Sequence, residues 1–300
     1  MDQIRWGIIG PGTIAHNFAD ALKESYSGQL KGIASYNEER RENFGNKYNI
    51  ENKFRFHDYE SLLNSNDVDA IYISTPHTFH AELSIKAAGK GKHVLCEKPA
   101  AVNLSEGKRV INAVREAGVF YMEGFMYRCH PQIKSLINLI KEKKIGDVIN
   151  IKSSFGFDMG KTIPESRLFR TDLAGGAILD VGLYPVSFSR LIAGVAIGKK
   201  FINPLSIKGS AKIGETLVDE IAHARMEFEN GITADISTAI REEMQNNAII
   251  KGTKGIIEID QPWTPGREGG SYHTTFKIMI NGSTETIDFK GFNHLFFFEA

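Results

Sequence analysis

The feature that most constrains this 300-residue chain is a glycine turn at the end of its first apolar run. Residues 4–9 form that run, Gly10-Pro11-Gly12 follows, and a helical pattern begins at Thr13. Between a strand and a helix, such a turn bends the backbone tightly and leaves the helix amides and positive dipole end open to phosphate. The turn predicts a dinucleotide-binding strand–helix unit; the alternative is an ordinary strand–turn–helix connection.

Roughly the first 120 residues alternate strand-like and helical patterns, which is typical of a parallel sheet with helices on both faces. We expect strands at residues 4–9, 31–36, 70–74, 93–96 and 119–122, and helices at residues 13–25, 38–48, 79–89 and 105–117. The fold class is therefore α/β, with an N-terminal Rossmann domain at residues 1–123.

The pattern changes after residue 130, where long runs with partial two-residue alternation follow one helix at residues 132–143. Strands are expected at residues 148–157, 205–213, 218–228, 233–241, 248–251, 255–259, 275–280 and 284–289. Short turns between several of them indicate a large, mostly antiparallel sheet. Residues 124–300 are thus expected to form a C-terminal α+β domain for substrate binding and oligomerisation.

Composition narrows the classes of partner. The 36 Lys and Arg residues balance 36 Asp and Glu residues, so no net charge favours nucleic acid or a membrane surface. No apolar run has the length of a membrane span, and the N-terminus has no secretory pattern. Cys96 and Cys129 suggest neither a disulfide framework nor a metal site. We expect a cytoplasmic protein with no metal, nucleic-acid or membrane partner.

The end of the second expected strand bears on which dinucleotide binds. NAD sites usually place an acid there to accept from the ribose hydroxyls. This chain has Ser35 and no carboxylate, with Arg40 and Arg41 in the next helix. The pattern favours the 2′-phosphate of NADP, but NAD stays possible because both arginines could belong to a solvated helix face.

Three further segments follow strand ends, where doubly wound folds place function. They are residues 74–80 (Ser-Thr-Pro-His-Thr-Phe-His), 97–99 (Glu-Lys-Pro) and 123–128 (Glu-Gly-Phe-Met-Tyr-Arg). With the glycine turn and residues 175–185 (Gly-Gly-Ala-Ile-Leu-Asp-Val-Gly-Leu-Tyr-Pro), they resemble the glucose–fructose oxidoreductase and inositol dehydrogenase family. The last two segments look most like its dimeric dihydrodiol dehydrogenase and D-xylose 1-dehydrogenase subgroup.

The resemblance implies hydride transfer between NAD(P) and a hydroxyl-bearing carbon of a sugar, sugar derivative or diol. Lys98 would be the catalytic lysine, often joined to its proline by a cis bond, and Tyr184 the acid/base, whose phenolate a nearby ammonium would favour. Asp180 would orient the substrate or the lysine. Each residue also has a structural alternative. Lys98 could be an exposed lysine beside Glu97, Tyr184 a buried aromatic at a helix start, and Asp180 a carboxylate at a helix N-terminus.

The turn and the resemblance together give the expected cofactor contacts. They are Gly10, Gly12, Thr13, Ile14, Ser35, Arg40, Ser74, Thr75, Pro76, His77, His80, Glu97, Lys98 and Arg128. His77 stands where the family most often has asparagine, and His80 fits a structural role equally well. Arg128 could contact the cofactor or the domain junction.

Two other functions stay open. One is hydrolysis or elimination on a glycoside with tightly held NAD; the other is non-enzymatic dinucleotide sensing, against which the retained Lys98 argues. The resemblance also implies a homodimer or higher homo-oligomer through the C-terminal sheet. Residues 295–298 are strongly apolar, and we expect a partner subunit or a further segment to cover them.

Overall fold

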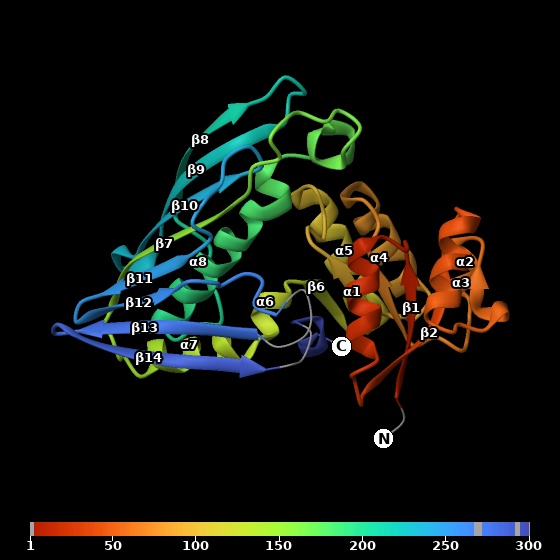
Figure 1. Cartoon of the computed structure of the whole chain (residues 1–300), viewed down its shortest axis with the longest axis horizontal. Coiled ribbons are helices and arrows are strands. Elements are labelled where there is room, and N and C mark those ends of the chain that lie inside the picture. The colour runs from red at the N-terminus through yellow and green to blue at the C-terminus, as the bar shows by residue number, and fades with distance from the viewer. Residues whose placement is uncertain (1–2, 267–271, 292–294, 300) are drawn as a thin grey trace. The chain divides into compact units, whose positions relative to one another are not determined.

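The computed structural model describes residues 3–266, 272–291 and 295–299, which form two compact units (Figure 1). The first unit runs to Phe125 and also includes residues 295–299. The second contains Met126–Gly266 and residues 272–291. Each unit has its own sheet.

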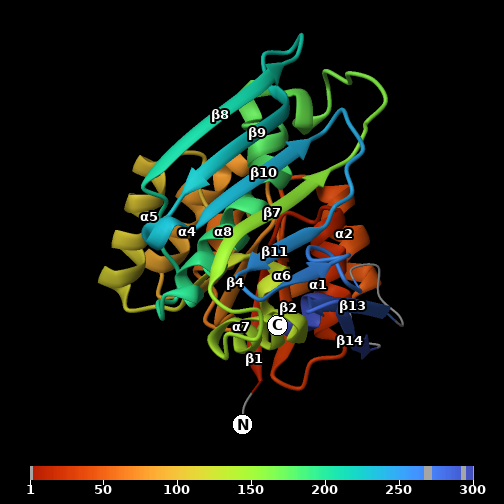
Figure 2. The same ribbon diagram turned by 90° about the vertical axis from the view of Figure 1, so that its left-hand side faces the viewer.

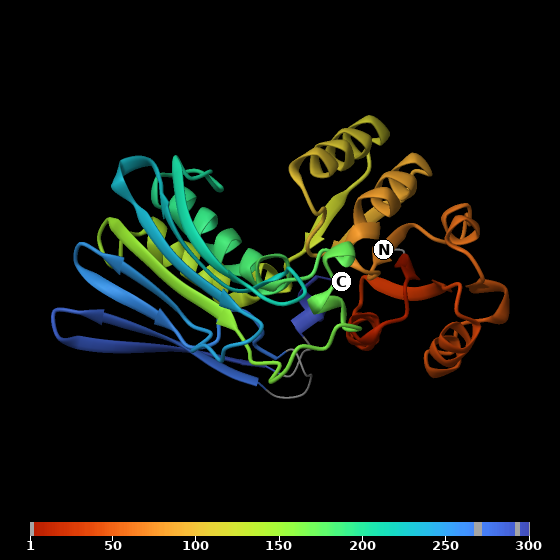
Figure 3. The ribbon, with the colours of Figure 1, turned by 90° about the horizontal axis from the view of Figure 1, so that it is seen from above.

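The first unit is built on a six-stranded parallel sheet with the order β3-β2-β1-β4-β5-β6. Its strands are β1 (Ile4–Ile9), β2 (Gly28–Ala34), β3 (Arg55–Phe56), β4 (Ala70–Ile73), β5 (His93–Glu97) and β6 (Tyr121–Gly124). Its α-helices are α1 (Thr13–Leu22), α2 (Glu38–Lys47), α3 (Tyr59–Leu63), α4 (His80–Gly89) and α5 (Leu104–Ala117). Helices cover both faces, as seen from above in Figure 3. The predicted Rossmann fold is confirmed.

The central strands are apolar throughout because both of their faces are covered. All four residues of β4 are buried, and Ile8 and Ile9 of β1 have no exposed surface. Helix α5 ends at Gly118, whose φ of 65° lies in the left-handed region that favours glycine. The predicted end of this helix at residue 117 is therefore confirmed.

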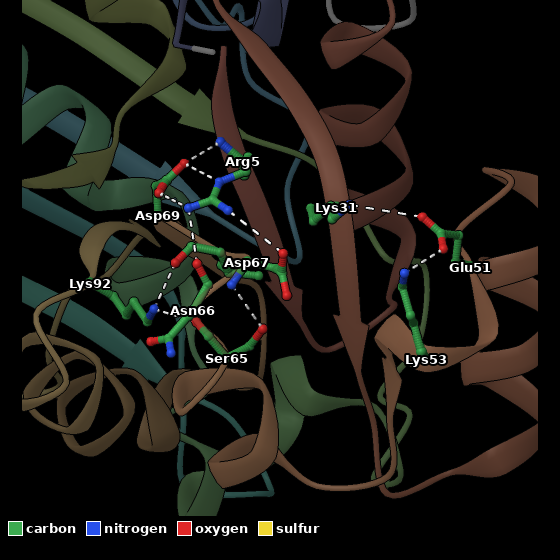
Figure 4. Close-up of polar contacts among 10 residues, drawn as sticks. Arg5, Lys31, Glu51, Lys53, Ser65, Asn66, Asp67, Asp69 and Lys92 are labelled. Atoms are coloured by element: carbon green, nitrogen blue, oxygen red, sulfur yellow. Dashed lines mark hydrogen bonds and ion pairs between the residues drawn. The ribbon is translucent and has the colours of Figure 1, made fainter. Parts of the chain in front are cut away.

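Polar contacts join the beginnings of β1, β4 and β5, at the sheet edge opposite the glycine turn (Figure 4). The Arg5 guanidinium donates to both Asp69 oxygens, from Nε at 2.9 Å and from Nη2 at 2.7 Å. The Lys92 ammonium donates to the carbonyl oxygens of Ser65 and Val68 at 2.6 and 2.7 Å. Burial lowers the pKa of Lys92. These groups stabilise the amino ends of the parallel strands. The loops that follow the carboxyl ends of the strands lie at the opposite side of the sheet.

The second unit is built on an eight-stranded sheet with the order β14-β13-β12-β11-β7-β10-β9-β8. Its strands are β7 (Val148–Gly156), β8 (Ser206–Ile213), β9 (Asp219–Glu227), β10 (Thr233–Ala239), β11 (Ala248–Gly252), β12 (Gly255–Ile259), β13 (Tyr272–Ile280) and β14 (Ser283–Gly291). Within this sheet, only the β7–β10 pair of the described strands is parallel, so the predicted mostly antiparallel sheet is confirmed.

Helices cover one face of this sheet, as Figure 2 shows. They are α6 (Met126–Cys129), α7 (Pro131–Lys141) and α8 (Leu183–Ala196), and α8 packs on β7 and β10. The helical stretch Thr171–Ala196 is long and apolar enough to cross a membrane, but 72% of its most apolar window is buried inside the structure. A buried core helix has the same properties.

The apolar segment near the end of the chain corrects one expectation. Leu295–Phe298 forms the short helix η7, which packs against α1 within the first unit. Leu295 and Phe296 are 0% and 1% exposed. The expectation that this segment needs a cover from outside the chain is wrong for these two side chains, because the chain itself buries them.

Candidate active site

Glycine stands at positions 10 and 12 for different structural reasons. Gly10 has a φ of +92°, and a Cβ there would lie 3.2 Å from the Ser74 carbonyl oxygen, so both backbone and space favour glycine. Gly12 has an ordinary φ of −89°, and a Cβ there would meet nothing within 4 Å in the described part of the chain. A larger side chain at Gly12 would therefore not disturb the local fold, but it would fill the open space above this residue.

The first turn of helix α1 follows the glycine turn directly. Gly12 is the N-cap of α1, no side chain of the described residues caps this helix, and its first turn contains no acid. Thr13 is exposed and Ile14 half-buried at this end. An uncapped first turn with a positive dipole end suits a pyrophosphate, and the residues therefore fit the dinucleotide.

The loop after β4 is joined to the glycine turn. The Ser74 hydroxyl donates to the carbonyl oxygens of Gly10 at 2.8 Å and Ile9 at 3.1 Å. The Thr75 hydroxyl is buried, and it has no hydrogen-bond partner among the described residues. The sheet order reverses between β1 and β4, the position at which open α/β sheets bind ligands.

The loop after β5 carries Lys98, and the Lys98–Pro99 peptide bond is cis, in agreement with what the resemblance implied. Side chains from two neighbouring strands hold this loop. The Tyr72 hydroxyl of β4 donates to Glu97 Oε1 at 2.5 Å, and the Ala100 amide donates to Glu123 Oε1 of β6 at 2.8 Å. Burial, and then the nearby Glu97 carboxylate, raise the pKa of Tyr72, so its hydroxyl keeps the proton that it donates.

His80 connects the two loops. Its ring is 0% exposed, with Nε2 at 2.7 Å from the Thr75 carbonyl oxygen and Nδ1 at 2.8 Å from the Pro99 carbonyl oxygen. The neighbouring His77 is also buried, with its ring centroid 5.9 Å from that of His80. Pro76, by contrast, is exposed.

The end of β2 separates the roles of the two arginines. Arg41 donates from Nη1 to the Ser35 carbonyl oxygen at 3.0 Å and pairs with Glu42. The Ser35 hydroxyl accepts from the Asn37 amide at 3.2 Å. Arg40, in the first turn of α2, is exposed, so its guanidinium is the accessible one.

In the second unit, Asp180 and Tyr184 lie at the start of one helical run, formed by η5 (Ile178–Gly182) and α8. The Asp180 carboxylate is 7% exposed and accepts from Arg167 Nη2 at 2.9 Å. Arg128 reaches the same helix, with Nη1 at 3.5 Å from the Ser187 hydroxyl oxygen.

Tyr184 lies in an aromatic cluster of its own unit. Its ring centroid is 5.2 Å from that of Phe155, 5.7 Å from Tyr127 and 6.2 Å from Trp263. The Trp263 indole donates to the Ser154 carbonyl oxygen at 2.8 Å and fixes that wall of the cluster. The phenol of Tyr184 is thus held on a packed surface, which favours one side-chain orientation.

A carboxylate from the sheet holds the beginning of this helical run. Asp219 of β9 accepts from the Ile178 amide at 2.7 Å, and burial raises the pKa of Asp219. Gly176, with a φ of +105°, allows the approach, since a Cβ there would lie 2.2 Å from Asp219 Oδ1. The helix end that carries Asp180 and Tyr184 is therefore attached to the sheet.

Sequence reasoning gave no role to four supporting residues, Tyr72, Glu123, Arg167 and Asp219, although Glu123 begins one of the segments that carried the resemblance. Tyr72 is a polar residue in an otherwise apolar strand, a signal that could have been noticed. The partners of Arg167 and Asp219 are distant in sequence, and no spacing rule predicts them. Among the described residues, no group of three or more His, Cys, Asp and Glu side chains could hold a metal ion.

Family models match both parts of the chain. Residues 4–125 match the oxidoreductase family with an NAD-binding Rossmann fold, and residues 133–258 match the GFO/IDH/MocA C-terminal domain. The chain belongs to this oxidoreductase family and is an NAD(P)-dependent oxidoreductase.

Sequence relatives narrow the subgroup. The chain is 33% identical over 264 residues to the mouse trans-1,2-dihydrobenzene-1,2-diol dehydrogenase, covering 87% of this chain and 76% of the relative. It is 34% identical over 287 residues to the Xenopus laevis enzyme of that name, covering 95% and 81%. The resemblance to the dihydrodiol dehydrogenase subgroup is confirmed.

Solved structures agree with the fold and the class. KijD10, a 3-ketoreductase from Actinomadura kijaniata in complex with NADP and TDP-benzene, is 26% identical with a TM-score of 0.83, covering 99% of this chain and 87% of that one. An aldose-aldose oxidoreductase from Caulobacter crescentus shares the fold at a TM-score of 0.84 and 24% identity, covering 95% and 83%. The dihydrodiol dehydrogenases and the 3-ketoreductase are named as redox enzymes, so the glycoside hydrolase and sensor alternatives are not favoured.

Proposed function

We propose that the chain transfers hydride between NADP and a hydroxyl-bearing carbon of a sugar, sugar derivative or diol. The first unit would bind the dinucleotide and the second the substrate. The observation that carries the proposal is the loop of Lys98, which the Tyr72–Glu97 and Ala100–Glu123 hydrogen bonds fix at the functional edge of the Rossmann sheet. The relatives named for diols and the ketoreductase solved with TDP-benzene support the substrate class.

The dinucleotide contacts follow from the loops at the carboxyl edge of the first sheet. The amides beyond Gly12 would bind the pyrophosphate, and the Arg40 guanidinium would bind a 2′-phosphate. Arg41 is less suited, since Ser35 and Glu42 already engage it. The remaining contacts would come from Ser74, Thr75, Pro76, His77, Glu97 and Arg128, as the resemblance implied. The dinucleotide, when bound, supplies the hydride acceptor or donor.

The acid/base chemistry belongs to Tyr184, Lys98 and Asp180. In oxidation, the phenolate of Tyr184 would take the hydroxyl proton while the Lys98 ammonium stabilises the developing oxyanion. The dinucleotide, when bound, would supply the acceptor for the hydride of the same carbon. Asp180, which accepts from Arg167, would also accept a hydrogen bond from a second substrate hydroxyl. A vicinal diol offers both hydroxyls, which suits this pair of residues.

The proposal is tested by replacing Lys98 with Met. We expect Lys98→Met to lower kcat by about a hundredfold or more, since loss of one group that stabilises the developing charge typically has this effect. Affinity for NADPH, measured by fluorescence titration, should change little. The matched control is Lys108→Met on the exposed face of α5. Equal turnover in the Lys98 variant and the control would remove Lys98 from the mechanism.

We also propose that the chain acts in the cytoplasm as a homodimer or higher homo-oligomer through its C-terminal sheet. Edge strand β8 and its flanks expose apolar side chains, with Leu205, Ile207 and Ile213 at 73%, 63% and 55%. Such residues on an open edge favour association with another copy. A monomer mass in sedimentation equilibrium at micromolar concentration would contradict this part of the proposal.

A further inference from the structure

His80 makes two contacts that a neutral histidine cannot both satisfy. Its Nε2 and Nδ1 lie at 2.7 and 2.8 Å from the carbonyl oxygens of Thr75 and Pro99. A carbonyl oxygen only accepts hydrogen bonds, and a neutral imidazole carries one N–H. One short contact would then join two lone pairs inside a 0%-exposed site. The protonated ring donates to both oxygens and removes that conflict.

The two carbonyl oxygens belong to different functional loops. Thr75 follows β4 and lies beside Ser74, whose hydroxyl donates to Gly10 in the glycine turn. Pro99 follows Lys98 directly. A ring that bonds both oxygens therefore sets the distance between the loop joined to the glycine turn and the loop that carries the lysine.

We propose that His80 is a positioning residue that, as an imidazolium cation, ties the loop carrying Lys98 to the loop carrying Thr75. The role of Lys98 in turnover rests on the proposed function, but the double hydrogen bond and the ring charge do not. Charge-assisted bonds to two backbone oxygens would hold both loops in place before substrate binds.

The segments next to His80 carry groups of both charges. Glu97 lies two residues before Pro99, and Glu123 of β6 accepts from Ala100 directly after it, so two carboxylates flank this loop. His77 and Lys98 also belong to these segments, and a positive charge on either would disfavour a cation at His80. On the helix that carries His80, Glu82 is paired with Arg109 of α5 at an exposed position.

Two substitutions separate the two hydrogen bonds. The amide nitrogen of asparagine can take the position of histidine Nδ1, and that of glutamine the position of Nε2. His80→Asn therefore keeps a donor for Pro99 and loses the one for Thr75, whereas His80→Gln does the reverse. Each variant is the control for the other, and both remove the charge.

The first measurement is nitrogen NMR of the wild-type chain labelled in its histidines. We expect one ring in which both nitrogens carry slowly exchanging protons at pH 7.5. Its signal should be absent from His80→Gln or His80→Asn. If neither variant folds, His77→Asn and His130→Asn assign the signal by elimination, since these are the other buried histidines among the described residues. A spectrum in which every buried ring carries a single nitrogen-bound proton would overturn the proposal.

The second measurement separates positioning from a merely structural role. His80→Gln, which frees Pro99, should lower kcat by roughly tenfold to a hundredfold, the effect of a displacement of about 1 Å in a catalytic group. Its Kd for NADPH should stay within about threefold. His80→Asn should keep most of kcat and raise that Kd instead. Equal losses in both variants, or unchanged kcat in His80→Gln, would refute positioning of Lys98. An inactive wild-type chain would refute the proposed function, while the NMR result would still decide the charge.

Discussion

The ion pair between Arg167 and Asp180 shows how one side chain holds another in place. Asp180 is buried and Arg167 is 46% exposed, so the guanidinium is the only one of the two groups well reached by water. Removing the guanidinium leaves the buried Asp180 carboxylate without the partner that holds its orientation. Arg167→Met should therefore lower kcat/KM by about tenfold, mainly through a higher KM for the substrate.

Arg170 is the matched control for this prediction. It lies on the same loop, pairs with the exposed Asp172, and is 43% exposed itself. A surface pair of this kind contributes little. Arg170→Met should therefore keep the wild-type kcat/KM, and an equal loss in both variants would show that the Arg167–Asp180 pair has no special role.

At this scale, sequence reasoning could name residues but not their contacts. Gly10, Lys98 and Tyr184 are recognisable because each stands in an ordered motif near an expected strand or helix end. The contacts of His80 with Thr75 and Pro99 depend on how two loops approach, which no residue spacing encodes. The same holds for Arg41, whose bond to the Ser35 carbonyl oxygen distinguishes it from Arg40 only in three dimensions.

Helix α7 shows how an element can make stability depend on pH. His130 is the N-cap of this helix, its Nδ1 accepts from the Gln132 amide, and the ring is 0% exposed. Burial lowers the pKa of His130 from 6.5 to about 4. The folded state therefore keeps the neutral ring while the unfolded chain takes up a proton. This group's contribution to the free energy of unfolding should fall by roughly 3 kcal/mol as pH drops from 6.5 to 4.

His130→Asn tests that dependence. Asparagine is a good N-cap and keeps an acceptor for Gln132, but it does not titrate in this range. Urea unfolding of both proteins at several pH values should give a flatter curve for the variant, even if lost packing against Tyr272 lowers its stability throughout. Parallel curves would contradict the account.

Sequence patterns located most elements to within a few residues, and their misses have physical causes. Strand β3, Arg55–Phe56, is too short to show alternation. Helix α8 was recognised only by its first residues, because it is buried on most sides and lacks the polar stripe that marks a surface helix. The parallel pairing of β7 with β10 depends on sheet order, which alternation does not report.

At the scale of the whole molecule, the sequence was sufficient for the architecture because the two halves follow different periodicities. Parallel strands buried on both faces produced continuous apolar runs in the first unit, and a sheet with one wetter face produced alternation in the second. The end of the chain was misjudged, since its apolar residues Leu295 and Phe296 pack on α1 rather than on a partner. That packing joins segments from opposite ends of the sequence, which no local pattern reports.

The central claim about this protein is that its glycine turn binds the dinucleotide. NADPH titration of Gly12→Val tests this binding most directly. Because a Cβ at Gly12 meets nothing within 4 Å among the described residues and φ is −89°, the variant should fold and melt like the wild type. It should nevertheless raise the Kd for NADPH by at least about tenfold, since the added side chain occupies the approach to the pyrophosphate. The control Gly89→Val, at an equally open glycine at the end of α4, should bind normally. Unchanged affinity in Gly12→Val, or a wild-type chain that binds neither NADPH nor NADH, would contradict the account.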